Sequence, residues 1–195
     1  ITMEDTRYFH CDIKTINLLP AVIYTQRAEE AGCDETILHR GDRVTECAHS
    51  NVHILKDGAL KTAPCDNLIL PGITRAHRIA QCKAMGIPVI EEPFTVQEMM
   101  EADEIFFTSA RALCCRIEEI DGQKVGGRDP ERIARIQKAA WNEALEEVRQ
   151  IKGENPHRKA DKYEKYRILQ RQNRAHRRDD GAHERPRLLF RRRRL

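Results

Sequence analysis

The sequence lacks the patterns of a metal-binding, secreted or membrane-spanning chain. None of its seven cysteines stands in a C-x-x-C pair, and none combines with histidines at a zinc-binding spacing. An odd number of cysteines without such patterns fits a reduced, cytoplasmic chain. No apolar run approaches the ~18 residues that span a bilayer, no signal-peptide pattern opens the chain, and no internal repeat is present. We therefore expect no metal ion and no membrane partner.

The charge of the chain is unevenly distributed. Residues 151–195 contain 16 lysines and arginines against 6 acidic residues, a net charge of +10. This leaves 18 basic against 25 acidic residues in 1–150, a net charge of −7. The basic segment has too few apolar residues to offset the entropy of ordering a fold. We expect 1–150 to form the folded domain and 151–195 to be a largely disordered tail, either a non-native extension or an arm that contacts nucleic acid through phosphates.

Local patterns within 1–150 predict an α/β (α+β) domain with mixed strand directions. Apolar residues at helical spacing predict a helix from Leu19 toward a glycine stop at Gly32. Two hairpins are expected within 35–46 and 51–64, the second with its turn at Asp57-Gly58. Three more helices are expected: one from about Thr74 to Gly86, one after a Thr95/Glu98 capping box, and one after Asp129-Pro130.

Three features of this domain could carry chemistry, although each also has an ordinary structural interpretation. Lys14 in "CDIKTINLLP" is either a solvated strand end or an amine desolvated by its apolar neighbours. Glu46 in "RVTECAHSNV" lies at the end of a strand, where a carboxylate is commonly solvated. The turn "LPGITR" opens a helix, which is either plain capping or a phosphate seat. Together they provide the three groups that hold pyridoxal 5′-phosphate.

These stretches, and "GIPVIEEPFTVQEMMEADEIFFTS" after them, resemble the D-amino acid aminotransferases of the fold-type IV pyridoxal-phosphate enzymes. The likeness covers about residues 10 to 148. It implies the mixed-sheet, pseudo-barrel C-terminal domain of that fold, without the smaller N-terminal domain, and a homodimer. Because the N-terminal domain supplies groups that hold the cofactor phosphate and the substrate, we expect this chain to be inactive or nearly so by itself.

The resemblance also assigns roles to individual residues. Lys14 is implied to form the Schiff base and to move the proton at the substrate, and Glu46 to pair with the pyridine nitrogen. The remaining residues are implied to support Glu46, pack on the ring or hold the phosphate: Ser50, Asn51, Leu70, Gly72, Ile73, Thr74 and Ser109. The chain departs from the family pattern at Cys47, where glycine is common, at His53, where phenylalanine is usual, and at Ala110, where a hydroxyl donor is frequent.

The implied reaction is ping-pong transamination between a D-amino acid such as D-alanine and a 2-oxo acid such as 2-oxoglutarate. Branched-chain aminotransferase and aminodeoxychorismate lyase remain alternatives within the same fold. From a different class, the alternative is a catalytically dead remnant or a nucleic-acid-binding chain that uses the basic tail. Cofactor absorbance would distinguish the enzyme from the remnant.

Overall fold

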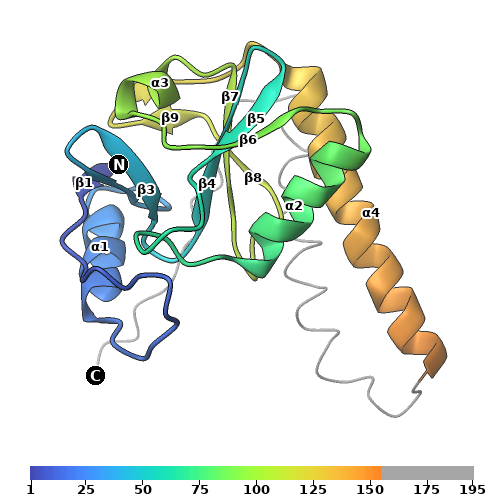
Figure 1. Cartoon of the computed structure of the whole chain (residues 1–195), viewed down its shortest axis with the longest axis horizontal. Coiled ribbons are helices and arrows are strands. Elements are labelled where there is room, and N and C mark those ends of the chain that lie inside the picture. Colours follow the sequence, from blue (N-terminus) through green and yellow to red (C-terminus); the bar gives the residue numbers. More distant parts are fainter. Residues whose placement is uncertain (155–195) are drawn as a thin grey trace. The chain divides into compact units, whose positions relative to one another are not determined.

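The computed structural model describes residues 1–154, so the predicted disordered tail falls almost entirely outside the described residues. The chain divides into two units, Ile1–Leu145 and Glu146–Leu195, and the fold described below is that of the first. Its elements, shown in Figure 1, are β1 (Thr2–Glu4), α1 (Leu19–Glu30), β2 (Ile37–Arg40), β3 (Arg43–Cys47), β4 (Asn51–Lys56), β5 (Ala59–Thr62), α2 (Ile73–Ala84), β6 (Val89–Glu91), α3 (Val96–Met100), β7 (Glu104–Thr108), β8 (Cys115–Ile117), β9 (Glu119–Ile120), β10 (Gln123–Lys124) and α4 (Pro130–Glu154). The predicted mixed α/β fold is confirmed.

The strands form open sheets, the largest of which has the order β6-β5-β4-β7-β8. Only β5 and β6 run parallel in this sheet, and its other neighbours are antiparallel. The predicted β4–β5 hairpin is confirmed, with Asp57 and Gly58 at φ values of 50° and 80°. Two consecutive positive φ values give the turn a twist that matches the flanking strands. A short pair, β9 and β10, forms a separate sheet.

Both faces of the five-stranded sheet are buried under separate cores. Successive side chains of a strand point to opposite faces, so each strand contributes to both cores. On one face, Leu55 and Phe106 pack with Ile79 of α2 and Ile133 of α4, and Figure 1 shows both helices on this side. On the other face, a second core contains alternate residues of the same strands together with residues from β2, β3 and α3. Its members include Val52, Ile54, Ile105, Ile37, Val44 and Met99. The sheet is therefore the central layer of the fold.

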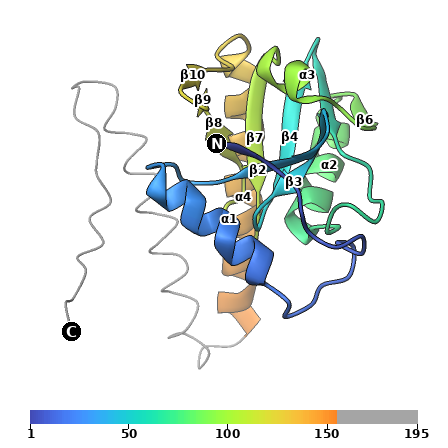
Figure 2. The same cartoon turned by 90° about the vertical axis from the view of Figure 1, so that its left-hand side faces the viewer.

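A three-stranded sheet, β1-β2-β3, lies beside this second core and supports α1 (Figure 2). Strand β1 runs parallel to β2 and was not anticipated from its three residues. The predicted helix from Leu19 is confirmed, and Gly32 follows its end at a φ of 72°. Its buried residues are Tyr24 and Ala28, whereas the apolar residues that suggested a packed face are exposed: Leu19, Val22 and Ile23.

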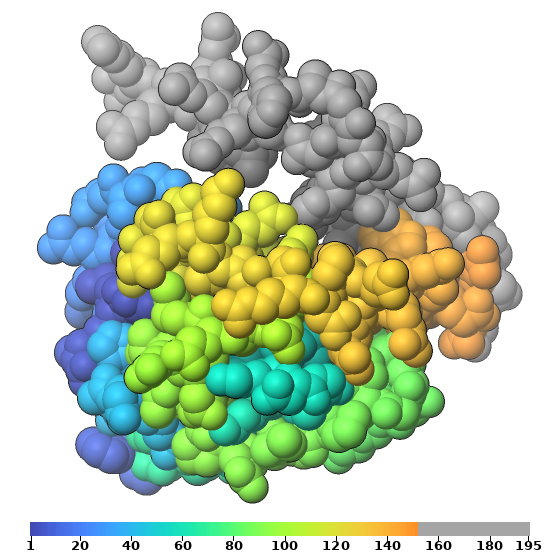
Figure 3. Space-filling view, turned by 90° about the horizontal axis from the view of Figure 1, so that it is seen from above, coloured from blue at the N-terminus to red at the C-terminus, as the bar shows by residue number. Residues whose placement is uncertain are grey.

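The ends of α3 and α4 follow the sequence signals. Thr95 and Glu98 form the predicted capping box, each side chain bonding to the other's backbone N–H. Asp129 accepts a hydrogen bond from the backbone N–H of Arg132, as expected of an N-cap residue before Pro130. The Arg132 side chain donates to the carbonyl of Gly58 at 3.0 Å. The start of α4 therefore lies against the β4–β5 turn, as Figure 3 shows.

His53 is a polar side chain inside the core. It is 0 % exposed, stacks on Phe106 with the ring centroids 4.7 Å apart, and shares a hydrogen bond with Thr108. Its Nδ1 atom has no hydrogen-bond partner among the described residues. Burial, with the positive charges of Arg75 and Arg78, lowers the pKa of His53 to about 3. The imidazole is therefore neutral in the folded chain at neutral pH.

A His53→Phe variant should keep its stability in mild acid better than the parent chain. Because the pKa of His53 is lower in the folded state than in the unfolded state, stability is lost as the pH falls from about 6.5 toward 3. Between pH 7 and pH 4.5 this amounts to about 2–3 kcal/mol, which phenylalanine would remove. Urea unfolding at the two pH values measures the difference. The exposed His10 provides the control, since His10→Phe should leave the parent slope unchanged; an unchanged slope for His53→Phe contradicts the interpretation.

Membrane-spanning helices and metal clusters are both absent from residues 1–154. No helix in this range is both long enough and apolar enough to cross a membrane. No group of three or more potential ligand side chains in the same range could hold a metal ion.

Candidate active site

The centre of the candidate site is Glu46, the penultimate residue of β3. Its side chain is buried, with a residue exposure of 5 %. The Oε1 atom accepts a hydrogen bond from Arg7, and the two side chains also form an ion pair. The Oε2 atom accepts from Asn51 Nδ2 at 3.0 Å and from the backbone N–H of Leu70 at 3.1 Å. Three donors therefore fix the carboxyl group.

The pKa of Glu46 reflects two opposing effects. Burial raises it, whereas the charge and hydrogen bond of Arg7 and the Leu70 N–H lower it, and the result is a pKa of about 7. An ionised carboxylate accepts about four hydrogen bonds. Because three are occupied, one acceptor position on Glu46 remains for a further donor, such as a protonated ring nitrogen.

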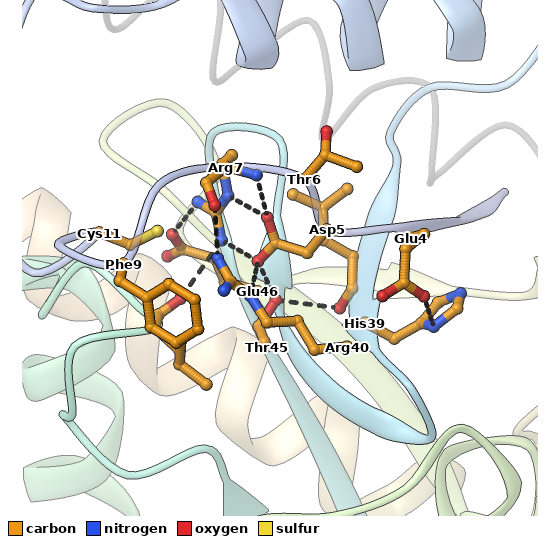
Figure 4. A network of polar contacts seen from close by, with 12 residues as sticks. Glu4, Asp5, Thr6, Arg7, Phe9, Cys11, His39, Arg40, Thr45 and Glu46 are labelled. Carbon is orange, nitrogen blue, oxygen red and sulfur yellow. Dashed lines mark hydrogen bonds and ion pairs between the residues drawn. The ribbon is translucent and has the colours of Figure 1, made fainter.

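Arg7 joins two carboxylates. Its Nε and Nη2 atoms donate to Asp5 at 2.9 and 2.8 Å, and Nη1 donates to Glu46. Figure 4 shows Arg7 between the two acids. Burial raises the pKa of Asp5, but the hydrogen bonds and charge of Arg7 outweigh it, so this pKa lies below its usual value. Sequence reasoning missed both residues, although "EDTR" places an acid and a base two positions apart.

Asn51 and Leu70 bind the second oxygen of Glu46, and Gly72 lies against Asn51. The amide of Asn51 donates both to Glu46 and to the carbonyl of Leu70, the latter at 2.9 Å. A Cβ atom at Gly72 would overlap with the Asn51 side-chain oxygen, so glycine leaves the space that this amide fills. Ser50 does not support Glu46, contrary to what the resemblance implied: its hydroxyl donates to Glu35 at 2.7 Å.

The start of α2 follows closely on Leu70, whose N–H binds Glu46. Gly72 is the N-cap residue of α2, and within the described chain no side chain caps this end. The first backbone N–H groups of a helix have no partner inside the helix, and they carry the positive end of its dipole. Thr74 donates to the carbonyl of Ser109 at 3.0 Å, which brings the end of β7 to this helix start, whereas Ile73 is largely exposed.

Arg75 adds buried positive charge at the same end of α2. It is 4 % exposed, and its Nη2 atom donates to the carbonyl of Ala63 and to Glu91. Its Nε atom has no hydrogen-bond partner among residues 1–154. A helix start with open N–H groups and a buried guanidinium beneath it suits a phosphate group.

Lys14 lies in the irregular segment before α1, and it is exposed. The prediction that its apolar neighbours desolvate the amine is wrong for the described chain, because Ile13 is 55 % and Ile16 98 % exposed. The segment is nevertheless anchored close to the site. The N–H of Cys11 donates to the carbonyl of Asn67, and the Asn67 side chain donates to the carbonyl of Phe9. Asn67 leads into Leu70, whose N–H binds Glu46.

Comparison with known proteins identifies the family. Residues 2–120, more than half of the chain, match the model of the amino-transferase class IV family. The chain belongs to the class IV aminotransferases. Among the curated class IV relatives, the D-alanine aminotransferase of Listeria monocytogenes serotype 4b (strain F2365) is 47% identical over 132 residues. The match covers 67% of this chain and 46% of that protein, so the chain spans about half the length of the curated relatives it matches.

Solved structures of class IV aminotransferases share the fold. The branched-chain amino acid aminotransferase of Escherichia coli matches with a TM-score of 0.61 and 29% identity, over 71% of this chain and 50% of that one. The T.th. branched-chain amino acid aminotransferase with pyridoxamine 5′-phosphate matches with a TM-score of 0.60 and 25% identity, over 64% and 42% of the two chains. That neighbour holds a form of the cofactor expected here.

Proposed function

We propose that this chain is the cofactor-binding part of an enzyme that transfers the amino group between a D-amino acid, such as D-alanine, and a 2-oxo acid, such as 2-oxoglutarate, with pyridoxal 5′-phosphate. The observation that carries the proposal is the buried Glu46, held by three donors with one acceptor position remaining. The substrate class is supported by the 47% identity to a D-alanine aminotransferase. The branched-chain enzymes match at lower identity, 25% and 29% for the two described above.

The residues of the site fit pyridoxal 5′-phosphate. Glu46 would accept a hydrogen bond from the protonated ring nitrogen, and Leu70 would pack against the ring. The phosphate would lie at the start of α2, held by Gly72, Ile73, Thr74 and Ser109 with the buried Arg75 beneath it. When bound, the cofactor supplies an electron sink for the electron pair that remains when the substrate loses its α-proton.

Lys14 would perform the covalent and proton-transfer steps. Its amine would hold the cofactor, be released by the incoming amino acid, and then take and return the proton at the α-carbon of the substrate. This requires a dry environment around the amine, which the described chain does not provide by itself. The exposed apolar side chains near Lys14 indicate that a partner chain covers this surface. We propose that the partner is a second copy of the complete enzyme. These side chains are Phe9, Ile13, Ile16, Leu18 and Leu19.

The domain division follows the same proposal. Residues 1–150 would form the larger cofactor-binding domain, whose open sheets would correspond to the pseudo-barrel of fold-type IV enzymes. Residues 151–195 would be a tail without a part in catalysis. The half of the relatives' length that the chain does not span is where we place the remaining substrate contacts.

Covalent labelling tests the proposed function. Mixing the chain with pyridoxal 5′-phosphate should produce the visible absorbance of a lysine-bound pyridoxal group, and borohydride reduction followed by peptide mapping should locate it on Lys14. Lys14→Ala should abolish the label completely, because no other amine would be placed to react. Lys83→Ala provides the matched control, since Lys83 is also an exposed lysine and should leave the label unchanged.

Two results would contradict the proposal. One is a label spread over several lysines, or equal labelling of Lys14→Ala and the parent chain. The other concerns the substrate: if, in the cofactor-loaded chain before borohydride reduction, L-leucine bleaches the visible band faster than D-alanine does, the branched-chain assignment would replace the D-amino acid one.

A further inference from the structure

The position of Arg7 suggests a role that its burial alone does not explain. Its guanidinium forms a two-point pair with Asp5 and uses its remaining terminal nitrogen for Glu46. A planar guanidinium that is held at two points has a fixed orientation. Asp5 therefore fixes the orientation in which the Arg7 guanidinium contacts Glu46.

Asp5 is itself rigidly held. Its side chain is 0 % exposed, and its Oδ2 atom accepts a hydrogen bond from Thr45, the residue before Glu46, at 3.0 Å. Its backbone N–H donates to the carbonyl of His39 at 2.7 Å. Arg40 approaches the same oxygen at 3.4 Å and does not bond to Glu46. Asp5, Arg7 and Glu46 therefore form a chain of contacts between the segment after β1 and the end of β3 (Figure 4).

The charge state of Glu46 decides what it could do for a bound ring. A carboxylate accepts a hydrogen bond from a protonated ring nitrogen and stabilises its positive charge, whereas a neutral carboxyl group leaves the nitrogen free to lose its proton. Burial favours the neutral form of Glu46. A cationic donor in direct contact is the feature that opposes this tendency.

We propose that Arg7, oriented by Asp5, is a positioning residue that favours the ionised form of Glu46 and, by holding Oε1 from one side, leaves the remaining acceptor position for the ring nitrogen of the cofactor. This deepens the proposed function and rests on it for the cofactor, but the effect of Arg7 on Glu46 is a property of the chain itself. The charged and titratable groups that interact with Glu46 are Asp5, Arg7, Cys11 and Cys47. Arg40 and Glu35 interact in turn with these neighbours, Arg40 with Asp5 and Cys11 and Glu35 with Cys47.

Carbon-13 NMR of the 195-residue chain without cofactor tests the effect on Glu46. Glutamate labelled at the side-chain carboxyl carbon gives one signal per residue, and the Glu46 signal is the one that Glu46→Gln removes. In Arg7→Met the titration midpoint of this signal should rise by at least one pH unit, a tenfold change in proton affinity. Arg7→Lys should raise it by less, because lysine keeps the charge but lacks the two-point geometry.

Arg40→Met is the matched control. Arg40 is a partly buried arginine that also contacts Asp5, with a side-chain exposure of 17 % against 12 % for Arg7, but it does not bond to Glu46. The proposal predicts a midpoint close to that of the parent chain for Arg40→Met. An equal rise in Arg40→Met and Arg7→Met, or no rise in Arg7→Met, would overturn it. If Arg7→Met does not fold, the titration midpoint of Glu46 in Arg7→Lys provides the test. An unchanged midpoint in Arg7→Lys would then overturn the proposal.

A second measurement separates this inference from the proposed function. The chain is loaded with pyridoxal 5′-phosphate labelled with nitrogen-15 in the ring, and the nitrogen shift reports whether the ring is protonated. A protonated ring is expected in the parent chain and an unprotonated one in Arg7→Met at the same pH. If the cofactor does not bind at Lys14, the proposed function fails while the carbon-13 titration still decides the role of Arg7. If it binds and the ring proton is unaffected, the inference about Arg7 fails alone.

Discussion

Gly72→Ala is expected to weaken the binding of pyridoxal 5′-phosphate by about 10- to 100-fold. A Cβ atom at this position would overlap with the side-chain oxygen of Asn51 and push its amide away. Glu46 would then lose one of its three donors, and the Leu70 carbonyl would lose its bond from the same amide. A hydrogen bond to a charged group contributes about 1.5–3 kcal/mol, which corresponds to this range of affinity. Titration of the visible absorbance band measures the change.

The Asn51→Ala background provides the control for this prediction. Asn51→Ala alone should weaken binding by a similar factor, because it removes the same amide. In the double variant the overlap is absent, so Gly72→Ala should add little to the loss already caused by Asn51→Ala. Losses that simply add in the double variant would mean that Gly72 acts by another route. The φ of Gly72, −66°, is accessible to alanine, so backbone strain does not confuse the comparison.

Glu104→Ala is expected to reduce the free energy of unfolding by about 3 kcal/mol. Glu104 is 0 % exposed and accepts from Arg116 Nε at 2.6 Å and Nη2 at 3.1 Å, and from the backbone N–H groups of Gly127 and Asp129. These contacts join β7 to β8 and to the segment that begins α4. Removing one partner of a buried pair leaves the other groups uncompensated, and this typically costs about 3–5 kcal/mol; the low end applies because Arg116 is 26 % exposed. Urea unfolding measures the loss.

Glu118 offers a matched control for Glu104. It pairs with the same arginine at 3.6 Å, but its side chain is 77 % exposed. Solvent-exposed ion pairs contribute about 0–1 kcal/mol, so Glu118→Ala should change stability by less than about 0.5 kcal/mol. Similar losses for the two variants would show that the charge of Arg116, rather than the buried position of Glu104, accounts for the effect.

Local signals allowed much of the fold to be predicted. The Asp57-Gly58 turn, the Thr95/Glu98 capping box and the Asp129 cap each involve residues within a few positions of one another. The interactions that specify such features are formed by neighbours in the chain, so the residue types alone indicate them. Strand β1 had no comparable signal, since three residues gain their structure only from pairing with β2, 35 positions later.

The candidate site was predictable in its residues but not in its contacts. Glu46, Asn51 and Leu70 were named from the resemblance, and the structure brings them together. Arg7 and Asp5 were missed, because Arg7 and Glu46 are 39 positions apart and their pairing depends on the three-stranded sheet. Ser50 was expected to support Glu46, yet it lies in the bend between β3 and β4 and its hydroxyl donates to Glu35 instead.

The sequence by itself determined the family, the order of helices and strands, and the types of chemical group available for a cofactor. Its resemblance to D-amino acid aminotransferases over about residues 10 to 148 is carried by residue identity, which needs no coordinates. Only the tertiary structure decided which buried charges meet, that Gly72 leaves space for Asn51, and that Lys14 lies exposed beside uncovered apolar side chains. The physical reason is that desolvation and charge pairing depend on the residues that the fold brings together from distant parts of the chain.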